Sequence, residues 1–191
     1  MTRVYFVRHA QSDYTCKNTR IRPLTPQGLI DRKKVTELLT KLPVDCFYSS
    51  PYKRAYDTIA DCAETLGMDI KIDERFSERL AGENGYSIEL TQKRWSDFNF
   101  CEPGGESLSS CQRRNIEALN EVLTAHEGKN IVIGTHGTAL STILNYYDPG
   151  YGFSDFVRIQ YWMPYVIQLD FLGLKCIDKQ ELLIINRPYE T

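Results

Sequence analysis

Two short segments of the chain place a histidine directly after an apolar run. Arg8-His9-Ala10 follows residues 4–7, and Thr135-His136-Gly137 follows residues 131–134. The protein has three histidines in all, so two of the three occupy this kind of position. In open α/β sheets, ligands bind at the carboxyl ends of the strands. Two imidazoles there, one of them beside an arginine, therefore predict a site for an anion.

A third cation, Arg54, is expected in the first turn of a helix that Ser50 caps and Pro51 begins. A cation at that end opposes the helix dipole, at a cost of about 0.3–1 kcal/mol. Binding of a phosphate by Arg54 together with the helix N-terminus would account for this placement. His136 likewise precedes a helix that is expected to begin near Thr138.

These residue types fit the requirements of phosphoryl transfer, which are a nucleophile, positive charge around the phosphoryl oxygens and a proton donor for the leaving group. His9 can be the nucleophile if it is neutral, and the positive charges of Arg8, Arg54 and a protonated His136 would disfavour its imidazolium form. A carboxyl must protonate the leaving oxygen. Glu78 and Glu83 both lie in the irregular stretch 76–83, and the chemistry alone does not choose between them.

Composition predicts one soluble domain. The 191 residues are 42% hydrophobic and 25% charged, with a formal net charge of −2, so nucleic acid is not an expected partner. No apolar run reaches transmembrane length, and a strand from about residue 3 leaves no room for a signal peptide, so we expect a cytoplasmic protein without membrane contact. The six cysteines have no metal-ligand spacing, which predicts reduced, buried thiols and no metal site.

Strand-like and helix-like segments alternate along the chain. This alternation predicts an α/β three-layer sandwich, with a mainly parallel central sheet and helices on both faces. We expect one domain over residues 1–191, with residues 74–106 as an irregular, cap-like insertion over the site. The expected strands are 4–7, 45–48, 69–72, 131–135, 165–171 and 181–185, and the expected helices begin near residues 26, 51, 88, 107 and 138.

Six motifs in this order resemble the histidine phosphatase superfamily, branch 1, which has the phosphoglycerate mutase-like fold. The resemblance spans residues 3 to about 140. The motifs are Arg8-His9-Ala10, Leu24-Thr25-x-x-Gly28, Ser49-Ser50-Pro51-x-x-Arg54-Ala55-x-x-Thr58, Phe76-x-Glu78-Arg79, Pro103-Gly104-Gly105-Glu106-Ser107 and Thr135-His136-Gly137.

The resemblance implies a phosphohistidine on His9, with Arg8, Arg54 and His136 binding the phosphoryl group. It selects Glu78 as the acid and then as the base for the hydrolytic water. It implies neither a metal nor another cofactor. Ser12 and Gly137 are further candidates for phosphate contact.

Departures from the family pattern concern the pocket, and one of them is a segment between Ser12 and Leu24 that is shorter than in mutases. Ala10 stands where the family usually has Gly. A glycine at that position would permit φ > 0 and a closer approach of the backbone. Gln11 stands where mutases carry Glu, and Asn84-Gly85-Tyr86 stands where Trp-Glu-Gly is usual.

We interpret the chain as a metal-independent phosphomonoesterase that acts on a small phosphorylated metabolite and releases inorganic phosphate. One alternative is a 2,3-bisphosphoglycerate-dependent phosphoglycerate mutase. Another is a protein phosphatase for phosphohistidine or phosphotyrosine, and a third is a phospho-ligand sensor. The sequence names neither the leaving group nor the oligomeric state.

Overall fold

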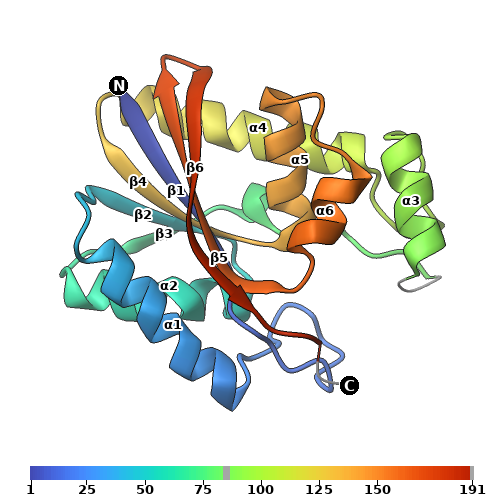
Figure 1. Ribbon diagram of the computed structural model, residues 1–191, viewed down its shortest axis with the longest axis horizontal. Helices are drawn as coiled ribbons and strands as arrows, with labels where there is room; N and C mark the ends of the chain where they lie inside the picture. Colours follow the sequence, from blue (N-terminus) through green and yellow to red (C-terminus); the bar gives the residue numbers. More distant parts are fainter. Residues whose placement is uncertain (84–86, 190–191) are drawn as a thin grey trace.

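The computed structural model describes residues 1–83 and 87–189, so the Asn84-Gly85-Tyr86 departure lies outside the described residues. A six-stranded sheet runs through the molecule in the order β3-β2-β4-β1-β5-β6 (Figure 1). Strands β1, β2, β3 and β4 are parallel to one another, and β5 is antiparallel to both of its neighbours, β1 and β6. The strands are β1 (Thr2–Arg8), β2 (Cys46–Ser49), β3 (Ile70–Ile72), β4 (Asn130–Thr135), β5 (Trp162–Leu172) and β6 (Lys175–Asn186).

Helices cover both faces of this sheet, because its central strands are apolar on both sides. In β1, Tyr5 and Val7 join one core cluster with α1 and α2, whereas Val4 and Phe6 join the other with α4 and α5. This alternation is the period-2 pattern of a strand that is buried on both faces. The helices are α1 (Pro26–Leu39), α2 (Lys53–Thr65), α3 (Ile88–Ser96), α4 (Leu108–Ala125), α5 (Gly137–Tyr147) and α6 (Phe153–Ile159), with a 3₁₀ turn over Glu74–Phe76.

The predicted α/β three-layer architecture is therefore confirmed (Figure 1). Side-chain caps mark three helix starts, because Thr25, Ser87 and Ser107 each accept a backbone N–H of the first turn. No helix within the described ranges is both long enough and apolar enough to cross a membrane.

Some element predictions were wrong. Helix α2 begins at Lys53 after Tyr52, not at Pro51 after a Ser50 cap, because the Ser50 hydroxyl is engaged elsewhere. Helix α6 was not predicted; its start is held by the Gly152 N–H, which donates to Asp155 Oδ2 at 2.9 Å. Strands β5 and β6 are longer than expected and turn at Gly173, where φ is +57°.

The cysteines also differ from expectation. All six are free, but only Cys62 and Cys111 are buried, and Cys101 is exposed.

Candidate active site

Three parallel strands end side by side and bring His9, His136 and Ser50 together. Arg8 pairs with Thr135 in the register of β1 and β4, so the two histidines follow at the same level. The His9 N–H donates to Thr135 O at 3.1 Å, and the two imidazole centroids are 5.4 Å apart. On the other side of β4, the Ser50 N–H donates to Gly134 O at 2.9 Å. The sequence predicted that the histidines converge, but it assigned Ser50 only to a helix cap.

The hydrogen bond of His9 defines which of its nitrogens is free. His9 Nδ1 lies 2.7 Å from Ala10 O, and a carbonyl only accepts, so Nδ1 carries the proton. Burial, together with the charges of Arg54 and Arg8, holds the pKa of His9 well below its usual value. The ring is therefore neutral, and Nε2 keeps its lone pair.

His136 is also neutral in this site, contrary to the expected cation. Burial lowers its pKa well below the usual value, and the charge of Arg54 lowers it further. His136 Nε2 lies 2.7 Å from Ser50 Oγ, and Ser50 Oγ also accepts the N–H of Tyr52 at 3.2 Å. A serine hydroxyl both donates and accepts, so this bond holds His136 Nε2 in place whichever of the two groups donates. His136 Nδ1 is buried and has no partner among the described residues.

Hydrogen bonds hold the guanidinium of Arg8 next to the start of α5. Its Nη1 donates to Ile159 O at 2.5 Å and its Nη2 to Gln160 O at 2.8 Å, both at the end of α6. A Cβ at Gly137 would lie 3.0 Å from Arg8 Cζ, closer than ordinary contact. Glycine at position 137 therefore leaves the space that the guanidinium occupies.

Arg54 approaches from the first turn of α2. Its Nη1 donates to Thr19 O at 2.6 Å, and its guanidinium lies 5.0 Å from the centroid of the Tyr52 ring. Burial lowers the pKa of Arg54, yet a guanidinium stays protonated at neutral pH. The Nε groups of Arg8 and Arg54 have no partner within the described part of the chain. Two buried cations thus flank His9.

Glu78 reaches the N-terminus of α5. Its Oε2 accepts the Thr138 N–H at 3.0 Å, and its Oε1 accepts the Ala139 N–H at 3.0 Å and the Arg79 N–H at 2.8 Å. Glu83, the other carboxyl that the chemistry left open, is exposed and does not line the cavity described below.

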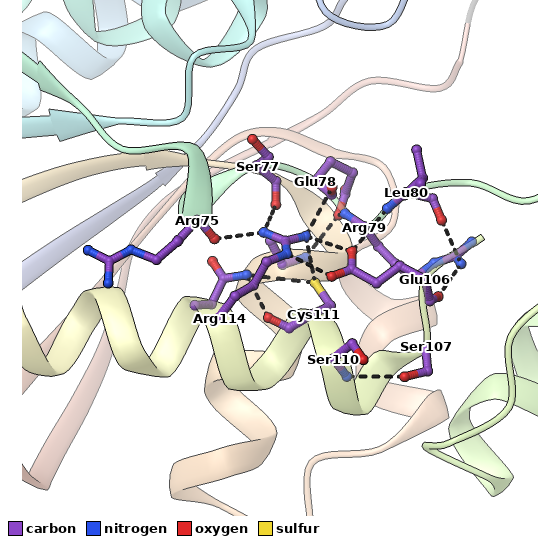
Figure 2. A network of polar contacts seen from close by, with 12 residues as sticks. Arg75, Ser77, Glu78, Arg79, Leu80, Glu106, Ser107, Ser110, Cys111 and Arg114 are labelled. Atoms are coloured by element: carbon purple, nitrogen blue, oxygen red, sulfur yellow. Dashed lines mark hydrogen bonds and ion pairs between the residues drawn. The ribbon is translucent and has the colours of Figure 1, made fainter. Parts of the chain in front are cut away.

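Arg114 of α4 fixes the backbone that carries Glu78 (Figure 2). Its Nη1 donates to Arg75 O at 2.6 Å and to Ser77 O at 2.8 Å, and its Nη2 donates to Glu78 O at 3.2 Å. The same guanidinium binds both carboxylate oxygens of Glu106, at 2.7 and 2.8 Å. Sequence reasoning missed this positioning residue, because its partners are distant backbone carbonyls that no spacing reveals.

These groups surround one cavity of about 450 Å³. Arg8, His9, Arg54, Glu78 and Gly137 line it, whereas His136 is fully buried against His9. Ser12 does not line the cavity; it is fully buried and forms a β-bridge with Leu24.

The departures at positions 10 and 11 leave this geometry intact. Within residues 1–83 and 87–189, only glycines have positive φ, so Ala10 adopts ordinary backbone. Its N–H donates to Thr58 Oγ1 at 2.9 Å. Gln11 Nε2 donates to Pro188 O at 2.8 Å and thereby ties the C-terminal segment to the site. A Cβ at Gly28 would lie 2.2 Å from Gln11 O, which explains the glycine of that motif.

Residues 4–171 match the family model described as histidine phosphatase superfamily (branch 1), so the chain belongs to this superfamily. A Hydrogenobacter thermophilus protein provisionally named phosphoserine phosphatase 2 is 32% identical over 158 residues, covering 75% of this chain and 77% of its own. A 2,3-bisphosphoglycerate-dependent phosphoglycerate mutase of Thermoplasma acidophilum is 29% identical over 157 residues, covering 74% of each chain. Among solved structures, a mycobacterial glucosyl-3-phosphoglycerate phosphatase in complex with inorganic phosphate shares the fold, with a TM-score of 0.73, 19% identity and coverage of 97% of each chain.

Proposed function

We propose that this protein is a phosphatase that hydrolyses phosphate monoesters through a covalent phosphohistidine on His9. The observation that carries the proposal is the state of His9, a buried neutral imidazole whose Nδ1 donates to Ala10 O at 2.7 Å. That bond leaves Nε2 as the nucleophile. Two buried arginines flank it and match the charge of a phosphoryl group.

In the first step, His9 Nε2 forms a bond to phosphorus while the bond from phosphorus to the leaving oxygen breaks. Protonated Glu78 gives its proton to that oxygen, so the alcohol departs neutral. Arg8, Arg54 and His136 bind the phosphoryl oxygens. Gly137 supplies the room for Arg8, and Ser50 orients His136. The fully buried Ser12 hydroxyl has no assigned step.

In the second step, water attacks phosphorus and the N–P bond breaks, which returns neutral His9 and releases inorganic phosphate. Glu78, now a carboxylate, takes the proton of that water. The structure shows Glu78 accepting three backbone N–H bonds, which is the acceptor role that a carboxylate fills.

The substrate we propose is a small phosphorylated metabolite, and the reaction needs no metal. A cavity of about 450 Å³ has the size of a small-ligand site. Residues 1–191 act as one domain, and residues 74–106 form a cap-like insertion, since Leu80, Ala81 and Trp95 from this stretch line the cavity. We place the protein in the cytoplasm.

A mutase is the second candidate, favoured by the 29% identity to a phosphoglycerate mutase over three quarters of the chain. The two candidates differ in where the phosphoryl group goes, since a mutase returns it to a bound sugar acid. The test is turnover of p-nitrophenyl phosphate and of phosphoglycerates, with and without added 2,3-bisphosphoglycerate. Release of inorganic phosphate without the bisphosphate supports the phosphatase. Interconversion of phosphoglycerates that depends on the bisphosphate contradicts it.

A further inference from the structure

The loop between β1 and α1 brings an arginine into the cavity that has no role in the site so far. Residues 13–22 form this loop, and the antiparallel bridge between Ser12 and Leu24 joins its two ends. Figure 1 shows the loop, in blue, beside the C-terminal segment. Arg22 stands at the end of the loop, is half-buried and lines the same cavity as His9. The loop therefore adds a cation to the site.

Two contacts set the direction of the Arg22 guanidinium. Its Cζ lies 4.4 Å from the centroid of the Tyr14 ring, and its Nε donates to Cys16 O at 3.1 Å. The Tyr14 ring meets the Tyr189 ring edge-on, with centroids 4.9 Å apart, and both tyrosines line the cavity. Stacking on an aromatic face suits a planar guanidinium and leaves its edge open for hydrogen bonds. The two Nη groups therefore form the open edge of Arg22.

Arg22 has more donors available than the two arginines already placed around His9. Arg8 uses Nη1 and Nη2 on the carbonyl oxygens at the end of α6, and Arg54 uses Nη1 on Thr19 O. Arg22 uses only Nε, and neither of its Nη groups has a hydrogen-bond partner among the described residues. A planar fork with both Nη groups available can bind two oxygens of one phosphoryl group.

The charge of Arg22 is also not paired with a carboxylate from the described part of the chain. Asp13, in the same loop, accepts the Thr15 N–H at 2.8 Å and the Thr15 hydroxyl at 2.6 Å instead. By contrast, Arg79 and Arg94, which line the cavity as well, share one carboxylate. An anion in the cavity would therefore give Arg22 the partner that the protein does not supply.

The charge of Arg22 acts at the nucleophile. Burial and the charges of Arg54 and Arg8 lower the pKa of His9, and the charge of Arg22 lowers it further. A cation that disfavours the imidazolium form of His9 stabilises a negatively charged phosphoryl group bound to the same ring. In phosphoryl transfer that negative charge is spread over three equatorial oxygens, so a third guanidinium has an oxygen to bind.

We propose that Arg22 is a further catalytic residue, which binds the transferring phosphoryl group through its two Nη groups, and that Tyr14 positions it. This inference rests on the proposed phosphatase function and adds a third guanidinium to its site. Arg22 acts on the group that every substrate shares, so its contribution does not depend on the leaving group.

The first test removes the charge of Arg22. Arg22→Met should lower kcat/KM for p-nitrophenyl phosphate and for glycerol 3-phosphate by the same factor, about 10- to 100-fold, because a charge-assisted bidentate contact is lost. Vanadate and inorganic phosphate have no leaving group, and calorimetry should show that both bind about tenfold more weakly or worse. Arg22→Lys keeps a cation without the planar fork and should give intermediate values.

Arg20→Met is the matched control. Arg20 belongs to the same loop and carries the same charge, but it is exposed, pairs with Glu74 and does not line the cavity. Its loss changes the net charge of the protein as the loss of Arg22 does. We expect Arg20→Met to change turnover and vanadate binding by less than about threefold, which separates direct contact from general attraction of anions.

A second test concerns the positioning role of Tyr14. Tyr14→Leu removes the ring face under the guanidinium and should lose part of the activity and of the vanadate affinity that Arg22 provides. Tyr14→Phe restores the face and should recover most of that loss. Added to Arg22→Met, Tyr14→Leu should cost less than about twofold more, because the two residues act as a unit. A ring that only supports the fold would give additive losses.

The possible failures are distinguishable. Folded Arg22→Met that matches Arg20→Met in turnover and in vanadate binding would overturn the role of Arg22 and leave the phosphatase function standing. A loss confined to one ester, with unchanged binding of phosphate and vanadate, would also overturn it. If Arg22→Met does not fold, Arg22→Lys and the Tyr14 variants decide the question. Wild-type protein that hydrolyses neither ester would contradict the phosphatase function itself, while the binding of phosphate and vanadate would still decide whether Arg22 belongs to the anion site.

Discussion

Replacement of Gly137 by alanine tests how closely Arg8 must be held. The added Cβ would lie 3.0 Å from Arg8 Cζ and 3.1 Å from Nη2, whereas ordinary contacts are about 3.5–4.0 Å. Arg8 must therefore move by roughly 0.5–1 Å. This movement would distort the hydrogen bonds from its Nη1 to Ile159 O at 2.5 Å and from its Nη2 to Gln160 O at 2.8 Å. Overpacking of this kind costs about 1–3 kcal/mol of unfolding free energy. A displacement of about 1 Å at a reacting site costs up to about 100-fold in rate.

We expect Gly137→Ala to lower kcat/KM for p-nitrophenyl phosphate by about 10- to 100-fold and to weaken binding of vanadate, a phosphoryl analogue. Thermal unfolding, steady-state kinetics and vanadate inhibition measure the three effects. Gly152→Ala is the control, because the nearest atom to its added Cβ is 3.9 Å away. If Gly137→Ala matches Gly152→Ala in stability, turnover and vanadate affinity, the assigned role of Gly137 is refuted.

Three further predictions concern the chemistry. Glu78→Gln should slow alkyl phosphates by about 10²- to 10⁴-fold and aryl phosphates much less, since phenolates need less protonation to leave; an equal loss on both would exclude Glu78 as the acid. Exhaustive EDTA treatment should leave turnover unchanged, with vanadate as a competitive inhibitor, because Arg8 and Arg54 supply the charge that a metal supplies elsewhere; activity that is lost and then restored by a divalent metal would contradict this. Because burial lowers its pKa, His9 should take up a proton at a lower pH than an ordinary histidine, whose pKa is about 6.5; a ¹⁵N NMR titration in which the imidazolium signal of His9 appears at the ordinary pH would refute the assigned state.

Much of the site follows from the sequence because of the sheet topology. The carboxyl ends of neighbouring parallel strands meet at one edge, so His9 and His136 must converge once both strands are recognised. Arg54 was also recognisable, because a cation in a first helical turn is electrostatically unfavourable. For each of these residues, its position at the end of a strand or in the first turn of a helix was sufficient to predict a place in the site.

Other parts depend on contacts between distant segments. Glu78 and Glu83 are indistinguishable by chemistry, and only the N-terminus of α5 and the bonds of Arg114 place Glu78 at the cavity. The sequence predicts that Ser50 caps a helix, whereas the structure places its hydroxyl 2.7 Å from His136 Nε2. Helix α6 has seven residues, too few for a periodic signal.

The central claim is that His9 carries the phosphoryl group, and trapping of the phosphoenzyme tests it most directly. After rapid acid-free quenching of the protein with ³²P-labelled substrate, we expect label that is stable to alkali, labile to acid and located on the peptide containing His9. His9→Ala should lose this label and the turnover, whereas His126→Ala should keep both, since His126 contacts Tyr48 away from the cavity. Undiminished turnover by His9→Ala, or label on another residue, would contradict the account.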